Sequence, residues 1–408
     1  MVRALANHNF RLWAGADLVS VTGSWMQVLG LNWVVLARTG SATAVGFSVL
    51  VSALPALLLG PWAGALADRF DPRRIIVAGQ SAHAGLAVVL AFLVWTDGPI
   101  GALYVLTALS GLITVFEGPA LGRFAGQVVP RDDLGNALAL GSLINSTGRV
   151  LGMTSAGMVA AIAGEEMLFL VNAASFVVVI MVIRAVRPAE LHPLAVSPPD
   201  RAGTRAGLRH VRGNRMLLTL FALGFVLSGL GRNYQVTMAA MTEGPLNAGP
   251  AGYGVVSAVF AAGTVLGGLI AARLRELTVP ILFTTAAITS VLQAVSGLAP
   301  GLIGFAVVIL PIAAGAVLID TVMSTRLQLD SAEDMRARVL AVQATVAAAA
   351  GATGAPLLGW LCERFGPTPA LMLAGLLTLA ATAVAAASAR KVRAEKSTGL
   401  YRLAPCPS

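Results

Sequence analysis

Long uninterrupted apolar runs recur along this 408-residue chain, and they constrain its fold more than any other feature. A helix of about 20 apolar residues crosses the roughly 30 Å hydrocarbon core of a bilayer. Hydrophobic residues make up 57% of the chain and charged residues only 12%, whereas charged residues are about 25% of an average soluble protein. The sequence therefore predicts an all-α integral membrane protein rather than a series of soluble domains.

Twelve apolar runs are candidate membrane spans. The first is too long for a cleavable signal peptide and lacks a small-residue cleavage site, so we interpret it as a span. The twelve are predicted at residues 13–36, 42–66, 75–95, 100–122, 136–162, 167–186, 217–242, 253–274, 279–298, 302–323, 339–361 and 368–388.

One long connection, rich in Pro, Ala and Arg, divides six spans from six. We predict an N-terminal half at residues 1–187, a cytoplasmic linker at 188–215, a C-terminal half at 216–389 and a cytoplasmic tail at 390–408. The two halves also repeat, because glycines spaced five and seven residues apart recur at a constant offset. These glycines are Gly152, Gly157 and Gly164 in the first half, and Gly354, Gly359 and Gly366 in the second.

The basic residues follow the topology. With the N-terminus inside, 24 of the 28 Lys and Arg residues fall in cytoplasmic loops and termini, as the positive-inside rule requires. The net charge of +9 is thus explained without nucleic acid, and both termini are predicted to be cytoplasmic, in the cell membrane. Cys362 and Cys406 are too few for a disulfide framework or a metal site, and no cofactor is expected.

A short, highly charged stretch joins the second and third spans. As a bare charge cluster it would only stop translocation and fix topology. Its pattern instead resembles the loop between helices 2 and 3 of the major facilitator superfamily, which forms part of the cytoplasmic gate. Asp71-Pro72 stand where the commonest family pattern has Gly followed by a basic residue. The gate residues that the resemblance implies are Gly64, Asp68, Arg69, Arg73 and Arg74.

Further short motifs extend this resemblance over nearly the whole chain. They are similar to those of the proton-linked exporter branch, which includes macrolide efflux proteins and siderophore exporters. The motifs are Asn9-Phe10-Arg11-Leu12-Trp13, Pro119-Ala120, Val129-Pro130, Asn136-Ala137, Asn172-Ala173, Ser175-Phe176 and Arg336-Ala337-Arg338-Val339. The branch usually carries Gly-Pro in helix 5, where this chain has Gly152-Met153.

The resemblance implies two parallel six-helix halves and a secondary transporter. We expect export of small amphipathic organic compounds, drug-, antibiotic- or siderophore-like, in exchange for protons by alternating access. An uptake permease or a uniporter for a small nutrient remains the alternative, because no residue encodes direction. A receptor or scaffold without transport disagrees with the intramembrane charges. No phosphate-binding loop or catalytic set occurs, so neither an enzyme nor a primary pump is expected. The expected partners are substrate, protons and lipid, and the expected state is a monomer.

Ionisable groups inside spans are costly and mark function. Asp17, Glu117 and Asp320 each lie six residues from an arginine, which is about 9 Å along a helix. They are the proton-coupling candidates, with Asp17 placed first and Glu117 next. The alternative is that they are gate ion pairs, closing against Arg123, Arg326 or the charged loop.

Polar residues repeat at helical spacing in several spans and suggest the walls of a water-filled cavity. Their hydroxyls are as readily explained by helix packing. The substrate-cavity candidates are Ser24, Gln27, Thr114, Asn145, Arg149, Arg232 and Gln235. Trp25, Tyr234, Met238 and Met241 either line an apolar pocket for a bulky substrate or are lipid-facing or packing residues. We interpret His83 as a satisfied polar residue rather than a proton relay.

Overall fold

The structure, a computed structural model, is built from helices. It describes residues 3–67, 70–130, 133–192, 209, 211–274, 276–331 and 335–397, and contains no strand within these ranges. A short 3-10 helix, η1 (Arg3–Ala6), comes first. The first half consists of α1 (His8–Thr39), α2 (Ala42–Ala67), α3 (Pro72–Trp95), α4 (Ile100–Gln127), α5 (Leu134–Ala163) and α6 (Glu166–Ala185).

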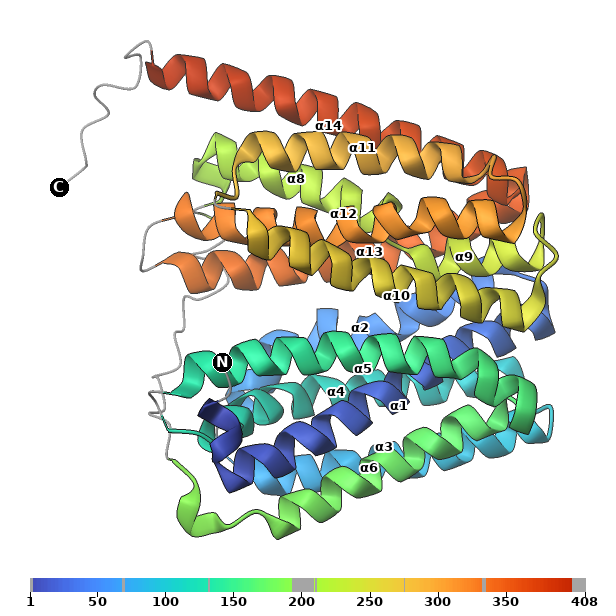
Figure 1. The fold of residues 1–408 in the computed structure, drawn as a ribbon, viewed down its shortest axis with the longest axis vertical. Helices are drawn as coiled ribbons and strands as arrows, with labels where there is room; N and C mark the ends of the chain where they lie inside the picture. The colour runs from blue at the N-terminus through green and yellow to red at the C-terminus, as the bar shows by residue number, and fades with distance from the viewer. Residues whose placement is uncertain are drawn as a thin grey trace.

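A second 3-10 helix, η3 (Pro188–Glu190), follows α6. The second half consists of α8 (Arg215–Leu230), α9 (Tyr234–Glu243), α10 (Gly249–Arg273), α11 (Val279–Ser296), α12 (Gly301–Leu329), α13 (Arg336–Phe365) and α14 (Pro367–Ser397). Figure 1 shows the two halves as separate groups, with α1–α6 in blue to green and α8–α14 in yellow-green to red. We call the end where α1 begins and α14 ends the terminal end, and the opposite end the distal end.

The predicted twelve spans and two six-helix halves are confirmed as the fold class. Among the described residues, eleven helical stretches are long and apolar enough to cross a membrane, with α8 and α9 counted as one. The remaining predicted span, at residues 136–162, forms the 30-residue helix α5, which is less apolar because it carries Asn145, Arg149 and several hydroxyl residues. It packs between α1 and α10, inside the bundle. The domain boundaries proposed for the linker and the tail stay predictions.

The seventh span was predicted as one helix over residues 217–242, and this is wrong in one respect. The helix breaks between α8 and α9, at residues 231–233. Asn233 donates its side-chain amide to the carbonyls of Gly229 at 2.7 Å and Ser228 at 3.4 Å, which would otherwise lack helical partners. Broken helices inside a membrane protein are tolerated where such groups are satisfied again.

The repeated glycines perform equivalent tasks in the two halves. Gly164 and Gly366 end α5 and α13 with φ of 92° and 90°, a conformation that side chains with a Cβ rarely adopt. A Cβ at Gly152 would strike α1, and a Cβ at its mate Gly354 would strike Gly229 of α8. The internal repeat read from the sequence is therefore also a repeat of helix contacts.

The hydrophobic cores show where the halves meet. At the distal end one large core contains residues of both halves, such as Trp33 and Phe169 together with Tyr253 and Leu358. Toward the terminal end each half has a core of its own, one around Phe124 and the other around Leu220. The halves are thus packed together at the distal end and separate toward the terminal end, as the spacing of the ribbons in Figure 1 also shows.

Candidate transport cavity

Two adjoining cavities lie in the middle of the bundle, and they share Trp25, Val49 and Gln235 in their walls. The central cavity, of about 250 Å³, lies between the two halves and is lined by residues of α1, α2, α5, α8–α9, α10 and α12. The other, of about 530 Å³, is lined almost entirely by α1, α2 and α4. We call this second one the N-half cavity.

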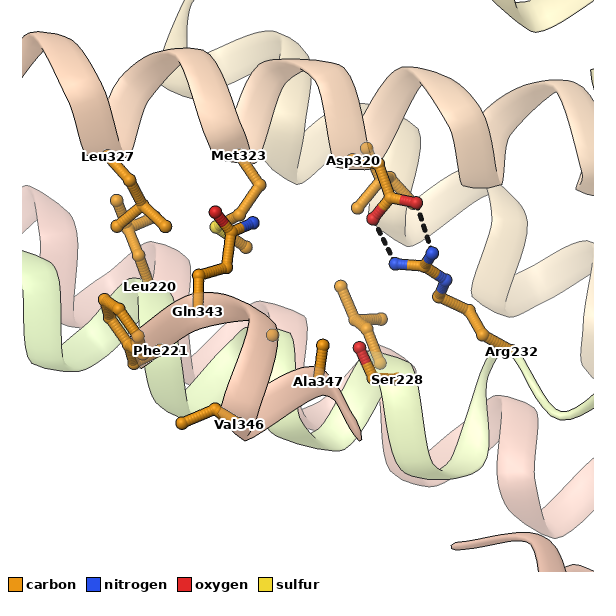
Figure 2. A pocket seen from close by; sticks show the side chains of 13 residues that line it. Leu220, Phe221, Ser228, Arg232, Asp320, Met323, Leu327, Gln343, Val346 and Ala347 are labelled. Carbon is orange, nitrogen blue, oxygen red and sulfur yellow. Dashed lines mark hydrogen bonds and ion pairs between the residues drawn. The ribbon is translucent and has the colours of Figure 1, made fainter. Parts of the chain in front are cut away.

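An ion pair marks the central cavity. Arg232 lies at the break between α8 and α9, and both of its terminal nitrogens donate to the two carboxylate oxygens of Asp320 on α12. Figure 2 shows this paired arrangement beside a smaller pocket between α8, α12 and α13. Two-point pairing of this kind fixes both side chains in direction as well as in distance. Asp320 therefore pairs with Arg232 rather than with Arg326.

Arg149 is the second guanidinium of the central cavity. Its Cζ lies 5.8 Å from the centre of the Trp25 ring, within the range of a cation–π contact. Arg149 lines the same cavity as Arg232 and Asp320, but no carboxylate of the described residues lies within ion-pair distance of it. Its buried Nε has no hydrogen-bond partner in the part of the chain that the structure describes.

The remaining walls of the central cavity are largely apolar and aromatic, formed by Met153, Tyr234, Met238 and Phe260. Trp25, Tyr234 and Met238 thus line a cavity, whereas Met241 is buried in the hydrophobic core. Gln235 lies where the cavities adjoin, and its Oε1 accepts from the Asn32 side-chain amide at 3.2 Å. This pair connects the first half to the second.

Glu117 lies apart from the central cavity, between α4 and α3. The carboxylate is 2% exposed and accepts a hydrogen bond of 2.8 Å from Gln80. The Nε2 of His83 lies 3.5 Å from its other oxygen. We call Gln80, His83 and Glu117 the buried acid cluster. The partners of the Glu117 carboxylate are thus Gln80 and His83, and not Arg123.

Hydroxyls connect the buried acid cluster to the N-half cavity. Ser110 lies 3.2 Å from Nδ1 of His83, and Thr114 lies 3.5 Å from Nε2. Both hydroxyl residues line the N-half cavity. His83 also stacks on Phe176 of α6, with ring centres 5.2 Å apart. The described structure thus places His83 between a cavity wall and a buried carboxylate.

The distal end is held closed by contacts between the halves. Glu363 of α13 accepts hydrogen bonds from the Ser41 hydroxyl, the Thr43 amide at 3.0 Å and the Thr43 hydroxyl at 2.7 Å. Trp33 stacks on Tyr253 with ring centres 6.1 Å apart. We call the contacts of Glu363 with residues 41 and 43 the distal latch.

The predicted gate loop is described only in part. Asp68 and Arg69 lie outside the described residues, and Gly64 belongs to the last turns of α2. Arg73 donates to the carbonyl of Ile183 at 2.9 Å, so it joins α3 to α6 within one half. Arg74 is exposed.

The departure at Asp71-Pro72 has a structural role. The Asp71 carboxylate caps α3 by accepting from the Arg73 amide at 3.0 Å, and Pro72 takes the first helical position. An acid at the N-cap followed by proline is a favourable helix start, because the proline removes an amide that would have no partner.

The other predicted residues separate into two groups. Gln27 and Thr114 line the N-half cavity, and Gln27 accepts from Asn172 at 2.8 Å. Asp17, Ser24 and Asn145 are not among the residues that line either cavity. Asp17 is half-buried on α1 without a hydrogen-bond or ion-pair partner among the described residues.

Sequence reasoning missed the partners of Glu117. Gln80 and His83 are three residues apart on the third span, so they share a face, and the stripe at 107, 110, 114 and 117 marks the facing helix. That signal was present in the sequence. What it lacked was the pairing of α3 with α4, which only the packing gives.

A family model described as transmembrane secretion effector matches residues 2–405. The chain belongs to this family. The transmembrane secretion effector family is a branch of the major facilitator superfamily, so the protein is a membrane transporter and not an enzyme. The two halves, the broken seventh span and the cavities between them are thus those of a multi-pass transporter of the plasma membrane.

Curated relatives of this transporter are distant in sequence. The staphyloferrin A transporter of Staphylococcus aureus is 22% identical over 61% of this chain, and the match spans 63% of that relative, less than two thirds of its length. Macrolide efflux protein A of Streptococcus pyogenes is 21% identical over 71% of this chain and 73% of its own. The multidrug efflux pump Tap of Mycobacterium bovis is 25% identical over 86% of each chain.

Solved structures of other transporters share the fold. A bacterial homologue of the human lysosomal transporter Spinster, in an inward-facing and unoccupied conformation, superposes with a TM-score of 0.74 at 14% identity, covering 98% of this chain and 99% of the other. A bacterial homologue of the iron transporter ferroportin, inward-facing, gives 0.71 at 15% identity, covering 94% and 98%. At these identities the likeness concerns the fold alone.

Proposed function

We propose that this transporter exports small amphipathic organic compounds in exchange for protons, by alternating access. The observation that carries the proposal is the central cavity, which lies between the halves, contains Arg149, Arg232 and Asp320 from three separate elements, and is closed at the distal end. Relatives named for staphyloferrin A transport, macrolide efflux and multidrug efflux favour export and an organic substrate.

The orientation follows from charge. Of the 28 basic residues, 24 fall on the terminal side when the N-terminus is placed inside, and the positive-inside rule makes that side cytoplasmic. The distal latch then lies outside. With the distal end packed and the terminal end separated, the conformation corresponds to an inward-facing state that accepts substrate from the cytoplasm.

Proton coupling is assigned to Glu117 first. An exchanged proton needs an acid whose affinity changes with conformation, and that acid must be free of a permanent counter-charge. Asp320 has such a counter-charge in Arg232, whereas Glu117 faces Gln80 and His83. Asp17, with no partner among the described residues, is the second candidate.

Purified transporter in proteoliposomes tests the proposal. With the interior acidified, a panel of aromatic acids, amines and macrocyclic compounds should show pH-driven uptake into the vesicles by transporters inserted with the cytoplasmic side outward. A flux that is unchanged when the pH gradient is collapsed would replace the antiporter with a uniporter. A complete lack of flux for wild-type protein across the panel, with the fold intact, would count against export of such compounds.

A further inference from the structure

The charges in the wall of the central cavity do not balance. Two guanidinium groups, Arg149 and Arg232, and one carboxylate, Asp320, are the charged groups among the described residues that line it. One positive charge is therefore left over. An uncompensated charge near the middle of a membrane is costly, so a ligand that neutralises it is favoured over one that adds to it.

The excess charge is located on Arg149. Arg232 already uses both terminal nitrogens on the two oxygens of Asp320. Arg149 has no ion pair among the described residues, and its Nε has no hydrogen-bond partner. A guanidinium binds a carboxylate through two parallel hydrogen bonds, so this side chain has the donors that such a ligand requires.

The Trp25 ring beside Arg149 restricts the direction from which a ligand can approach the guanidinium group. An aromatic ring 5.8 Å from the guanidinium carbon holds the cation by its face, and the N–H groups around the guanidinium plane then remain for a planar anion. Met153, Tyr234, Met238 and Phe260 complete an apolar surround in a volume of about 250 Å³. A ligand that fits has one anionic group and a compact apolar or aromatic body.

We infer that Arg149 is the recognition site for a carboxylate on the transported substrate, which makes organic monoanions the preferred substrate class. That the bound anion is a transported substrate rests on the proposed function. That Arg149 binds an organic anion rests on the cavity alone. Organic cations are disfavoured, because they would meet the excess positive charge of Arg149 at short range.

Matched probes test the inference directly. Binding of 2-naphthoate, its methyl ester and 2-naphthylmethylamine is measured by titration calorimetry on the full chain in detergent. We expect 2-naphthoate to bind at least about tenfold more tightly than the ester, which is the scale of one charge-assisted bidentate contact. Equal or tighter binding of the ester or the amine overturns the inference on wild-type protein, whatever the variants do.

Two small anions distinguish the source of the charge preference. Acetate and inorganic phosphate carry charge without an apolar body, so both should bind far more weakly than 2-naphthoate. If phosphate binds as tightly, the site selects a phosphate group, such as that of a lipid, and the carboxylate assignment is wrong.

Variants then locate the site. Arg149→Gln should reduce the preference for acid over ester to near unity, and Arg149→Lys should retain part of it, because lysine keeps the charge but not the planar pair of donors. Arg364→Gln is the matched control, since it removes an exposed arginine at the far end of α13. An acid preference that survives in Arg149→Gln overturns the assignment.

The binding test and the transport test fail separately. Anion binding that depends on Arg149, in a protein that moves no compound in proteoliposomes, would sustain the inference and sink the transport proposal. Driven flux of amines without Arg149-dependent acid binding would support the transport proposal and overturn the inference.

Discussion

The imidazole Nε2 of His83 lies 3.5 Å from the Glu117 carboxylate, although the two residues are on different helices and both are buried. Asp320 of α12 lies 203 residues after Glu117, close to the offset of 202 between the repeated glycines, and this repeat mate of Glu117 is instead held by Arg232. The fold has therefore placed one acid beside neutral or titratable partners and its mate beside a permanent cation. Because of this asymmetry, we expect Glu117 rather than Asp320 to be the acid that exchanges a proton.

Glu117→Gln should abolish pH-driven transport while leaving substrate exchange nearly intact. The amide keeps the size and the hydrogen bonding of the side chain but cannot carry a proton. We expect driven flux to fall by about tenfold or more, with counterflow changed by less than about threefold. Asp17→Asn and Asp320→Asn are measured in parallel. If all three variants accumulate substrate as wild type does, coupling through these acids is wrong.

Gly79→Ala should impair the same step without replacing a titratable group. A Cβ at this position would lie 2.7 Å from Cδ of Glu117 and 2.8 Å from its Oε2, so the carboxylate must move. Driven flux should fall by about fivefold, with the fold retained, because the neighbour is the end of a flexible side chain. Gly85→Ala, on the same helix with nothing within 4 Å, is the control. Equal flux in the two variants would contradict the placement of the proton site.

The distal latch should control the balance of conformations. Glu363→Gln removes the charge that the Ser41 and Thr43 donors stabilise, and a hydrogen bond to a charged group contributes about 1.5–3 kcal/mol. The outward-facing population should rise by about tenfold. The outward-facing population is measured by labelling a Gln235→Cys variant from outside the cell. In this variant Cys362 and Cys406 are replaced by Ser. Glu243→Gln is the control. Unchanged labelling in Glu363→Gln would contradict the proposed role of the distal latch.

The Arg232–Asp320 pair should behave as a unit. Arg232→Asp or Asp320→Arg alone brings two like charges together at the helix break, and each should reduce transport by about tenfold or more. The double variant restores an opposite-charge pair and should recover part of the activity. A double variant no better than the worse single one would show that the two side chains act independently in transport.

The proposed orientation is tested by labelling single cysteines in intact cells. Labels at Ser197, which lies outside the described residues, and at Ser397 should be reached only after the membrane is permeabilised. A label at Glu243, exposed at the distal end, should react from outside. The opposite pattern would reverse the topology and exchange the roles of the two ends.

The sequence by itself determined the class of this protein. Spans of apolar residues leave no alternative to a helical membrane body, because unpaired backbone groups are not tolerated in lipid. The glycine repeat fixed the two halves, and Gly164 and Gly366 adopt matching backbone angles. Asp320, Arg149 and Arg232 were recognisable as candidate functional residues because charge is scarce inside a membrane.

Only the tertiary structure decided which of these groups face one another. Local spacing places residues on a face of one helix, but it contains nothing about which helix lies opposite. Spacing along the helix suggests Arg123, six residues away, as an ion-pair partner of Glu117. Its partners in the structure, Gln80 and His83, come from α3. The Arg232 side chain at the break, residues 231–233, likewise meets Asp320 of α12, and the spacing within either helix does not contain that contact. Pairing between helices is a long-range property, and therefore the pairing of the charges was settled by packing.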